Sequence, residues 1–297
     1  MQARAAPFRG ANPHKAPPAS RRGAAAAPAA RGAAAAARRV RCAAAAEEYA
    51  ALQGCTVQRV ADGSPVELLS LWPAAPGQRV VLPFLTHFGD LTSWEFAQQL
   101  QKKALPQLEA AGVKVITVGL GSPENARVFA SSLGYPTADL YADPTGACYS
   151  ALAFSPGFAA AAEGVDPYLK LLPMLMGIGS PGTVQEVLRG YVGDREAPPV
   201  FDGALGRAFN ILGQGYQRPM ELATLRLQNM VGVLSKWGDL APEEKRLLTQ
   251  QGGCLVFDGC ELRYKHSDPG ILKYADVGAV VAAAVEAPRK MIAKQRE

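Results

Sequence analysis

The chain has 297 residues and a net charge of +5, but its charges are unevenly distributed. Residues 1–42 hold nine of the 31 basic residues and none of the 26 acidic ones, so the remainder carries 22 basic against 26 acidic residues. This balance excludes a protein that binds nucleic acid or anionic membranes through its general charge. A hydrophobic content of 48% excludes intrinsic disorder for the remainder, which is long enough to bury a sizeable core.

The first 46 residues have the composition of an organelle targeting segment. They contain 21 Ala, together with Pro, Gly and Arg, and no acidic residue. Arg residues interrupt the Ala runs, so the continuous apolar segment of a secretory signal is missing. The stretch Val40-Arg41-Cys42-Ala43 resembles a plastid stromal processing site, which predicts a transit peptide over 1–42 and a location in the chloroplast stroma. A mitochondrial destination and an untargeted Ala-rich tail stay open as alternatives.

Residues 43–78 are predicted to form a lead-in to the main domain. The apolar spacing indicates a short helix over 43–52 and two short strands over 57–60 and 66–71. A Pro- and Gly-rich turn then precedes the main domain, 79–297.

The main domain begins with strands and helices in alternation. Continuous apolar runs over 79–87, 113–118 and 140–142 are typical of strands that are covered on both faces. Thr92-Ser-Trp-Glu95 predicts a capping box at the start of the first helix, and Ser122-Pro123 predicts the start of the second. This order predicts a parallel sheet with right-handed crossover connections.

Residues 155–245 depart from this alternation. Gly and Pro are enriched over 155–215, and an apolar stripe predicts a helix over 219–237. A hairpin with an Asp258-Gly259 turn and a C-terminal helix from about Ala275 complete the chain. A parallel β-α-β unit, an antiparallel hairpin and a final helix are the order of a thioredoxin-like three-layer α/β sandwich, with 155–245 as a Gly/Pro-rich and helical insertion.

The helix over 219–237 is predicted to bury its apolar stripe in the core. The stripe consists of Leu222, Leu225, Met230, Val233, Leu234 and Trp237. Arg218, Arg226 and Lys236 are predicted to lie on its polar side, where contact with a partner or a thylakoid surface stays open.

Three blocks of the chain resemble the peroxiredoxin-like AhpC/TSA family, which includes the peroxiredoxin-like 2 and prostamide/prostaglandin F synthase proteins and their plastid relatives. The blocks are the strand end Thr86-His-Phe-Gly89, the strand and turn over 140–144, and Gln250-Gln-Gly-Gly253 with the hairpin and Lys265-His-Ser-Asp-Pro269. The resemblance covers roughly 79–153 and 245–285, and it implies a thioredoxin-like fold.

Redox-active members of this family carry Cys-x-x-Cys directly after His-Phe-Gly, at the start of the following helix. The helix dipole and the free N–H groups there stabilise a thiolate. In this chain the two positions hold Asp90 and Ser93. A carboxylate forms neither a sulfenic acid nor a disulfide, and a serine hydroxyl is no nucleophile without a base. The resemblance therefore implies a degenerate site, at which the family's peroxidase or disulfide-reductase mechanism is not expected.

Four cysteines follow the predicted processing site. They are Cys55, Cys148, Cys254 and Cys260. None has Cys-x-x-Cys spacing, and the scattered His residues complete no metal pattern, so neither a metal nor a cofactor is predicted. Inert buried thiols are the simpler interpretation, although a redox centre built from Cys148, Cys254 or Cys260 stays open. The predicted turn places 257 opposite 260, so a bond between Cys254 and Cys260 is not expected.

His87 and Asp90 could approach each other at the end of the first strand, with Glu95 nearby. An acid–base site there is conceivable. The simpler interpretation is a helix-capping cluster of Asp90, Thr92 and Glu95, with His87 hydrogen-bonded at the sheet edge.

The sequence favours a plastid protein with a non-catalytic role, which binds or assists other plastid proteins through 155–245. The alternative is an antioxidant oxidoreductase, of the peroxiredoxin or prostamide-synthase type, that uses other cysteines. The longest uncharged stretch considered for a membrane span, 171–185, is 15 residues long and contains Pro and Gly, so it is too short and too broken to cross a membrane. Peripheral contact with a thylakoid surface stays open.

Overall fold

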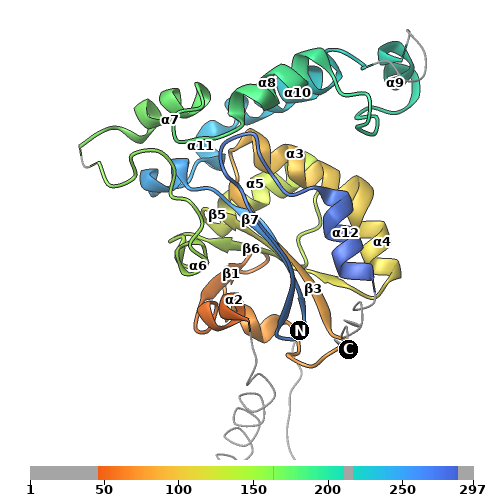
Figure 1. Ribbon diagram of the computed structural model, residues 1–297. Helices are drawn as coiled ribbons and strands as arrows, with labels where there is room; N and C mark the ends of the chain where they lie inside the picture. Colours follow the sequence, from red (N-terminus) through yellow and green to blue (C-terminus); the bar gives the residue numbers. More distant parts are fainter. Residues whose placement is uncertain (1–45, 163, 211–216, 287–297) are drawn as a thin grey trace, which may run out of the picture. The chain divides into compact units, whose positions relative to one another are not determined.

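The computed structural model describes residues 46–162, 164–210 and 217–286. These residues form a mixed α/β domain around one eight-stranded sheet (Figure 1). The strand order is β2-β1-β6-β5-β3-β7-β8, and β4 pairs with β3 off this path. The predicted transit peptide lies outside the described residues.

The strands follow the predicted order of a parallel unit and an antiparallel hairpin. Their bounds are β1 Thr56–Arg59, β2 Pro65–Glu67, β3 Arg79–His87, β4 Lys114–Val115, β5 Thr117–Leu120, β6 Leu140–Asp143, β7 Gly253–Asp258 and β8 Glu261–Ser267. Strands β3, β5 and β6 run parallel, while β7 pairs antiparallel with both β3 and β8. This arrangement confirms the predicted thioredoxin-like α/β fold.

Helices cover both faces of the sheet, because its central strands are apolar on both sides. Along β3, Val81 and Leu85 point into one apolar core, whereas Val80, Leu82 and Phe84 point into the other. The first core is covered by α3 Leu91–Gln99, η2 Leu100–Ala104, α4 Leu105–Ala110, α5 Pro123–Leu133 and α12 Val277–Val285. The second is covered by α2 Glu47–Ala51, η1 Leu68–Leu71, α6 Ala147–Ala151 and η3 Lys245–Thr249. The sheet is therefore the middle of three layers.

The segment 155–245 adds further helices on the side of α3 and α5. They are α7 Pro167–Leu175, α8 Thr183–Val192, α9 Gly203–Phe209, α10 Glu221–Ser235 and α11 Trp237–Leu240. Helix α10 packs on α3 and α8, and α11 packs on α5. Figure 1 shows α8 and α10 as an outer layer beyond α3.

The predicted strand over 66–71 is wrong in its second half. Strand β2 ends at Glu67, and a single 3-10 turn follows over Leu68–Leu71. Leu68 and Leu69 are both buried in the same core. Two consecutive side chains cannot enter one core from a strand, since strand side chains alternate between faces.

The predicted hairpin turn is wrong by one residue. Asp258 pairs with Glu261, so the two turn residues are Gly259 and Cys260, and Gly259 has the left-handed φ of 63°. A bulge between Val256 and Phe257 then shifts the register. The Asp258 carboxylate accepts a hydrogen bond from the Gly77 backbone and pairs with Arg79, and these contacts hold it within the strand. Residue 257 accordingly faces Leu262 and not Cys260.

The two predicted helix starts have different outcomes. Helix α5 begins as predicted, with Ser122 as N-cap, Pro123 at the first position and reciprocal bonds with Asn125. The capping box at Thr92 and Glu95 is wrong, because α3 begins two residues earlier with Asp90 as its N-cap. Asp90 follows β3 after the two turn residues Phe88 and Gly89, and its carboxylate accepts the Ser93 N–H of the first helical turn.

Candidate functional site

The family's two cysteine positions lie where β3 ends and α3 begins. The Asp90 carboxylate accepts a hydrogen bond from the Ser93 backbone N–H at 3.0 Å and one from the Thr86 hydroxyl at 2.6 Å. The hydroxyls of Thr86 and Ser93 are 2.6 Å apart. A carboxylate thus takes the helix-start position that would stabilise a thiolate, and two hydroxyls complete the network.

His87 is not the hydrogen-bonded residue at the sheet edge that the sequence suggested. It lies on the central strand β3 and is buried, and its Nδ1 has no hydrogen-bond partner in the described part of the chain. Its ring meets Trp237 edge-on, with centroids 5.8 Å apart. Burial lowers the pKa of His87, with partial opposition from the Asp90 carboxylate, so the imidazole is neutral at pH 7. Asp90 and His87 share a backbone hydrogen bond, from the Asp90 N–H to the His87 carbonyl at 2.9 Å, but among the described contacts their side chains share none.

Asp268 is a site residue that sequence reasoning missed. It directly follows β8 and is buried. Burial raises the pKa of Asp268 to about 6; the nearby Asp90 carboxylate adds to this, while His266 opposes it. The Nε2 of His266 lies 3.2 Å from the carboxylate, without the alignment of a hydrogen bond. The only available signal was an Asp in the block 265–269, which carried part of the family resemblance.

A small pocket, with room for about one water molecule, joins Thr86 and Ser93 to Asp268. It is lined by Phe84, Leu85, Thr86, Thr92, Ser93, Phe96, Asp268 and Tyr274. Hydroxyl groups and one acid with a raised pKa converge there, an arrangement that can hydrogen-bond a small polar molecule. It offers no thiol, and no group of three or more His, Cys, Asp or Glu side chains suited to a metal ion occurs in the described ranges.

The raised pKa of Asp268 predicts a specific dependence of stability on pH. An Asp with a pKa of about 6 in the folded chain and 3.8 in the unfolded chain binds its proton more tightly when folded. The stability that Asp268 adds to the folded chain is therefore fully present below about pH 4 and is lost as the pH rises to about 6. We expect the free energy of unfolding to fall by about 2–3 kcal/mol across this window, and Asp268→Asn to remove that fall. Urea titrations of both proteins at several pH values check this; parallel curves would contradict it.

The structure separates the cysteines that the sequence proposed as a redox centre. All four described cysteines are free. Cys148 and Cys254 are buried in the cores on opposite faces of the sheet, and Cys254 lies opposite His266. Burial raises the pKa of the Cys254 thiol. Cys55 and Cys260 are half-buried and pack against the core that contains Cys148.

A buried cluster of charges joins the segment 155–245 to the rest of the domain. Arg226 on α10 donates from Nε and Nη2 to the Glu95 carboxylate on α3, at 2.7 and 3.3 Å. Tyr274 donates its hydroxyl to the same carboxylate at 2.7 Å. The predictions that Glu95 caps its helix and that Arg226 lies on an outward polar face are therefore wrong. The two side chains pair because each needs a counter-charge once it is buried.

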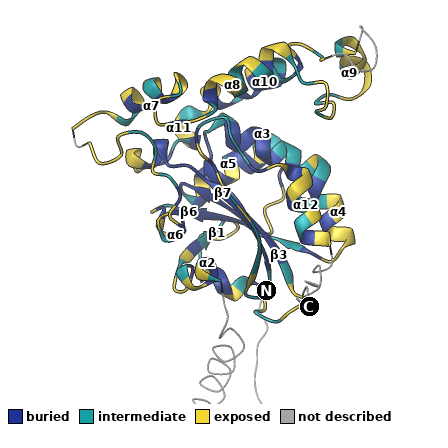
Figure 2. Ribbon diagram, in the orientation of Figure 1, coloured by how far each residue is buried: buried dark blue, intermediate teal, exposed yellow. Residues whose placement is uncertain are grey.

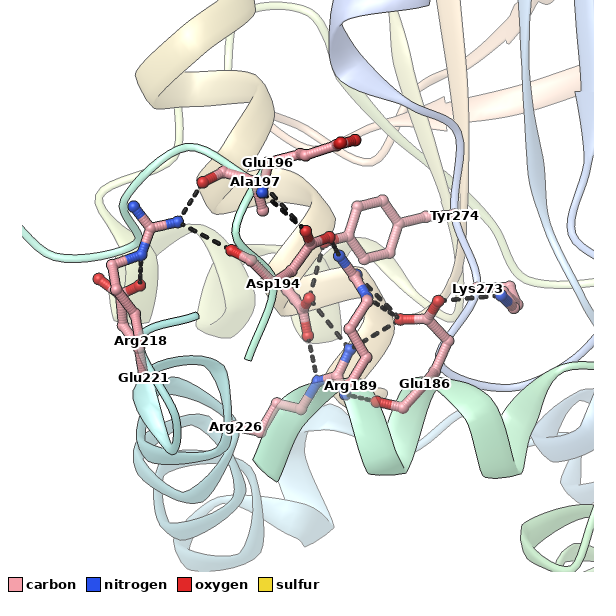
Figure 3. Close-up of polar contacts among 11 residues, drawn as sticks. Glu186, Arg189, Asp194, Glu196, Ala197, Arg218, Glu221, Arg226, Lys273 and Tyr274 are labelled. Atoms are coloured by element: carbon pink, nitrogen blue, oxygen red, sulfur yellow. Dashed lines mark hydrogen bonds and ion pairs between the residues drawn. The ribbon is translucent and has the colours of Figure 1, made fainter. Parts of the chain in front are cut away.

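Glu186 on α8 extends this cluster (Figure 3). Its carboxylate pairs with Lys273 at 2.9 Å, with Arg189 at 2.9 Å and with Arg226 at 3.6 Å. Burial alone would raise the pKa of Glu186, but hydrogen bonds from Lys273 and Arg189 and their positive charges lower it overall. The carboxylate is therefore ionised at pH 7 and connects α8 with α10 and with the segment before α12.

The fold and the site define a thioredoxin-like protein in which an acidic residue stands at the start of α3. A family model of AhpC/TSA antioxidant enzymes matches residues 99–270, which is more than half of the chain. The chain therefore belongs to the AhpC/TSA antioxidant enzyme family. The match begins after Asp90 and Ser93 and does not bear on these two positions. No match was found among curated proteins or among solved structures.

Proposed function

We propose that this chain is a chloroplast protein that has kept the family's fold without its thiol chemistry at Asp90 and Ser93, and that binds another protein through the outer side of 155–245. One observation carries the proposal. Of the large hydrophobic side chains that are exposed in the described residues, all except Val285 lie between Val165 and Leu234.

Helix α10 shows the reason for this exposure. Leu227, Val231 and Leu234 follow each other at helical spacing and are 58–64% exposed. Arg226 and Glu221, on the other side of the helix, are buried. The side of α10 that faces the domain thus buries two charged residues together with Leu225 and Val233, while an apolar stripe faces outward, where an amphipathic helix usually carries polar residues.

Helices α8 and α7 repeat this arrangement. The exposed side chains of α8 include Val184, Leu188 and Tyr191, whereas Glu186 turns inward. On α7, the only charged residue is Lys170, which is buried and donates to the Ala162 carbonyl at 2.8 Å. No exposed position on α7, α8 or α10 carries a charge.

These side chains form what we call the outer apolar surface. It consists of Leu169, Leu172, Leu175, Val184, Leu188, Tyr191, Leu227, Val231 and Leu234. Helix α8 contacts both α7 and α10, and Figure 2 shows exposed residues along all three helices. Eight of these nine large side chains are at least half exposed, whereas large apolar side chains on the surface of a monomer are normally scattered singly.

The chemistry of this surface favours a protein partner with an apolar, uncharged patch. Amphipathic helices that lie on anionic membranes carry Lys and Arg around their apolar face. The three helices carry no fully exposed basic residue, and Arg189, whose side chain is 36% exposed, is paired with Glu186 and Asp194. The same lack of charge matches the core of protein–protein interfaces, from which charged residues are depleted. No helix in the described ranges is long and apolar enough to cross a membrane.

The composition of residues 1–46 supports the chloroplast stroma as the location of the protein, with the mitochondrion as the alternative. Import of the full chain into isolated chloroplasts, followed by sequencing of the mature N-terminus, tests this part of the proposal. A mature chain that starts at Ala43 inside the stroma supports it, and import into mitochondria alone contradicts it.

The outer apolar surface predicts a loss of binding when α10 is made polar. Changing Leu227, Val231 and Leu234 to Ser removes three exposed side chains, each of which contributes about 1.5–3 kcal/mol when fully buried. We expect the dissociation constant for the protein partner to rise by at least about tenfold. The partner is identified with a photo-crosslinking residue at 231, and its affinity is then measured with purified proteins by calorimetry.

Two matched controls accompany this experiment. Gln228→Ala changes an exposed polar position on the same helix and is expected to leave the affinity unchanged. A crosslinker at Ser131, which is exposed on α5, is expected to capture no partner. Crosslinking of 231 only to a second copy of the chain, or binding to lipid vesicles that the three Ser changes abolish, would contradict the proposal.

A further inference from the structure

The pocket beside Ser93 is lined by polar side chains from three separate segments of the chain. Thr86 lies near the end of β3, Thr92 and Ser93 lie in the first turn of α3, and Asp268 follows β8. The remaining walls are largely aromatic or aliphatic. A molecule in this pocket therefore meets few hydrogen-bonding groups, and the donors and acceptors among them decide what fits.

The Ser93 hydroxyl offers an acceptor to the pocket. A serine or threonine hydroxyl has one proton to donate and two lone pairs with which to accept. Thr86 donates its hydroxyl proton to the Asp90 carboxylate at 2.6 Å. The 2.6 Å contact between the hydroxyls of Thr86 and Ser93 must then use the Ser93 proton. Both lone pairs of the Ser93 Oγ stay available, since no described residue donates to them.

Thr92 offers the opposite group, a hydroxyl proton. Its Oγ1 accepts a hydrogen bond from the Leu272 backbone N–H at 3.1 Å, which leaves its own proton for an acceptor in the pocket. This position lies one residue before Ser93, in the same helical turn. The pocket therefore presents a donor and an acceptor from neighbouring residues.

Asp268 adds a second acceptor. Its side chain is only 5% exposed, and its Oδ1 has no hydrogen-bond partner in the described part of the chain. The raised pKa of Asp268, about 6, is still below 7, so the carboxylate is mostly ionised at neutral pH. An ionised oxygen that is buried without a donor is costly. The carboxylate therefore favours an occupant that donates a hydrogen bond.

We propose that this pocket binds one water molecule, which accepts a hydrogen bond from Thr92 and donates to the Ser93 Oγ and the Asp268 carboxylate. Water has two protons to donate and lone pairs with which to accept, and the pocket has room for about one such molecule. An ammonium ion cannot accept from Thr92, and a chloride ion is repelled by the Asp268 carboxylate. The water joins Asp268 to the hydrogen-bond network that includes Asp90.

The bound water connects the start of α3 with the residues that follow β8. A buried water with three hydrogen bonds to otherwise unsatisfied groups is part of the folded structure and is costly to remove. Ser93 stands at the second cysteine position of the family, so the chain uses this position to hold its fold together. The inference does not rest on the outer apolar surface, none of whose residues lines the pocket.

The test is a crystal structure of the full chain at neutral pH, at a resolution that shows ordered water. We expect one water within about 2.5–3.0 Å of Thr92 Oγ1, Ser93 Oγ and a carboxylate oxygen of Asp268. Magnetic relaxation dispersion of water deuterons counts long-lived internal waters in solution. Ser93→Val, which replaces the hydroxyl with methyl groups, is expected to lower this count by one. Ser131→Val is the matched control, because Ser131 is exposed on α5, and it is expected to keep the count.

Three outcomes overturn the proposal. One is a wild-type density map without a peak in the pocket although other buried waters are resolved. The second is a peak with six or more oxygen ligands at about 2.3–2.6 Å, which marks a calcium ion. Both are read from the unmodified protein, so they hold even if Ser93→Val folds poorly. The third is an equal number of long-lived waters in the wild-type chain and in Ser93→Val.

Discussion

Arg226→Met is expected to lower the free energy of unfolding by about 3–5 kcal/mol, because it leaves the Glu95 carboxylate buried without its counter-charge. Glu95 is 1% exposed. Its contacts are two hydrogen bonds from Arg226 and one from the Tyr274 hydroxyl. A single neutral donor does not offset the cost of keeping an ionised carboxylate out of water. Urea titration with a fixed m-value measures the loss.

A double variant separates the net contribution of the Glu95–Arg226 pair to the free energy of unfolding from the cost of leaving one of its charges unpaired. Glu95→Gln with Arg226→Met removes both charges and is expected to recover much of the stability lost in Arg226→Met alone. The exposed pair of Arg127 and Glu124 on α5 provides the control, since its atoms lie 2.9 Å apart in solvent. Glu124 is the residue to change, because Arg127 also donates to the Val60 carbonyl. Glu124→Gln is expected to leave stability nearly unchanged. Equal losses in Glu124→Gln and Arg226→Met would show that burial does not set the strength of the Glu95 pair.

Arg226→Met also tests which contacts hold the segment 155–245 against the rest of the domain. Arg226 also donates to the Glu186 backbone carbonyl at 2.8 Å, so one side chain connects α10 with both α3 and α8. Hydrogen exchange in Arg226→Met is therefore expected to rise first in α8 and α10, and later in the sheet. Because these helices carry the outer apolar surface, partner binding should weaken in parallel.

The fold was predictable from the sequence because its signals are local. The continuous apolar run of β3, the Ser122-Pro123 helix start and the turn-bounded hairpin each depend on a few neighbouring residues. The errors there are small, one residue in the hairpin turn and two residues at the start of α3. Both arise from a carboxylate, of Asp258 or Asp90, whose contacts fix the boundary.

The candidate sites were less predictable because they depend on contacts between distant segments. A helical stripe shows that α10 has two faces, but not which face the domain covers. Met230 and Leu234 were predicted to be buried and are exposed, because Arg226 finds Glu95 across 131 residues and turns the polar side inward.

Asp143→Ala is expected to lower the free energy of unfolding by about 2–4 kcal/mol, because one buried carboxylate holds the whole turn from β6 into α6. Asp143 is fully buried. It accepts hydrogen bonds from the backbone N–H groups of Thr145, Gly146, Ala147 and Cys148, at 2.9–3.3 Å, and one from the Thr145 hydroxyl. Removal leaves these donors without an acceptor, and each buried unsatisfied group costs about 1–3 kcal/mol. Some of these donors can turn towards water in the variant, so the total loss of stability stays below the sum of the individual costs.

Asp62→Ala is the matched control, because Asp62 also accepts bonds from a backbone N–H and a hydroxyl, both of Ser64, but does so in solvent. It is expected to leave the urea midpoint unchanged. A second readout follows from the position of Cys148 on α6. If Asp143 secures that helix, Asp143→Ala should also accelerate alkylation of the Cys148 thiol. Loss of stability with an unchanged alkylation rate would mean that the carboxylate stabilises the end of β6 and not the helix.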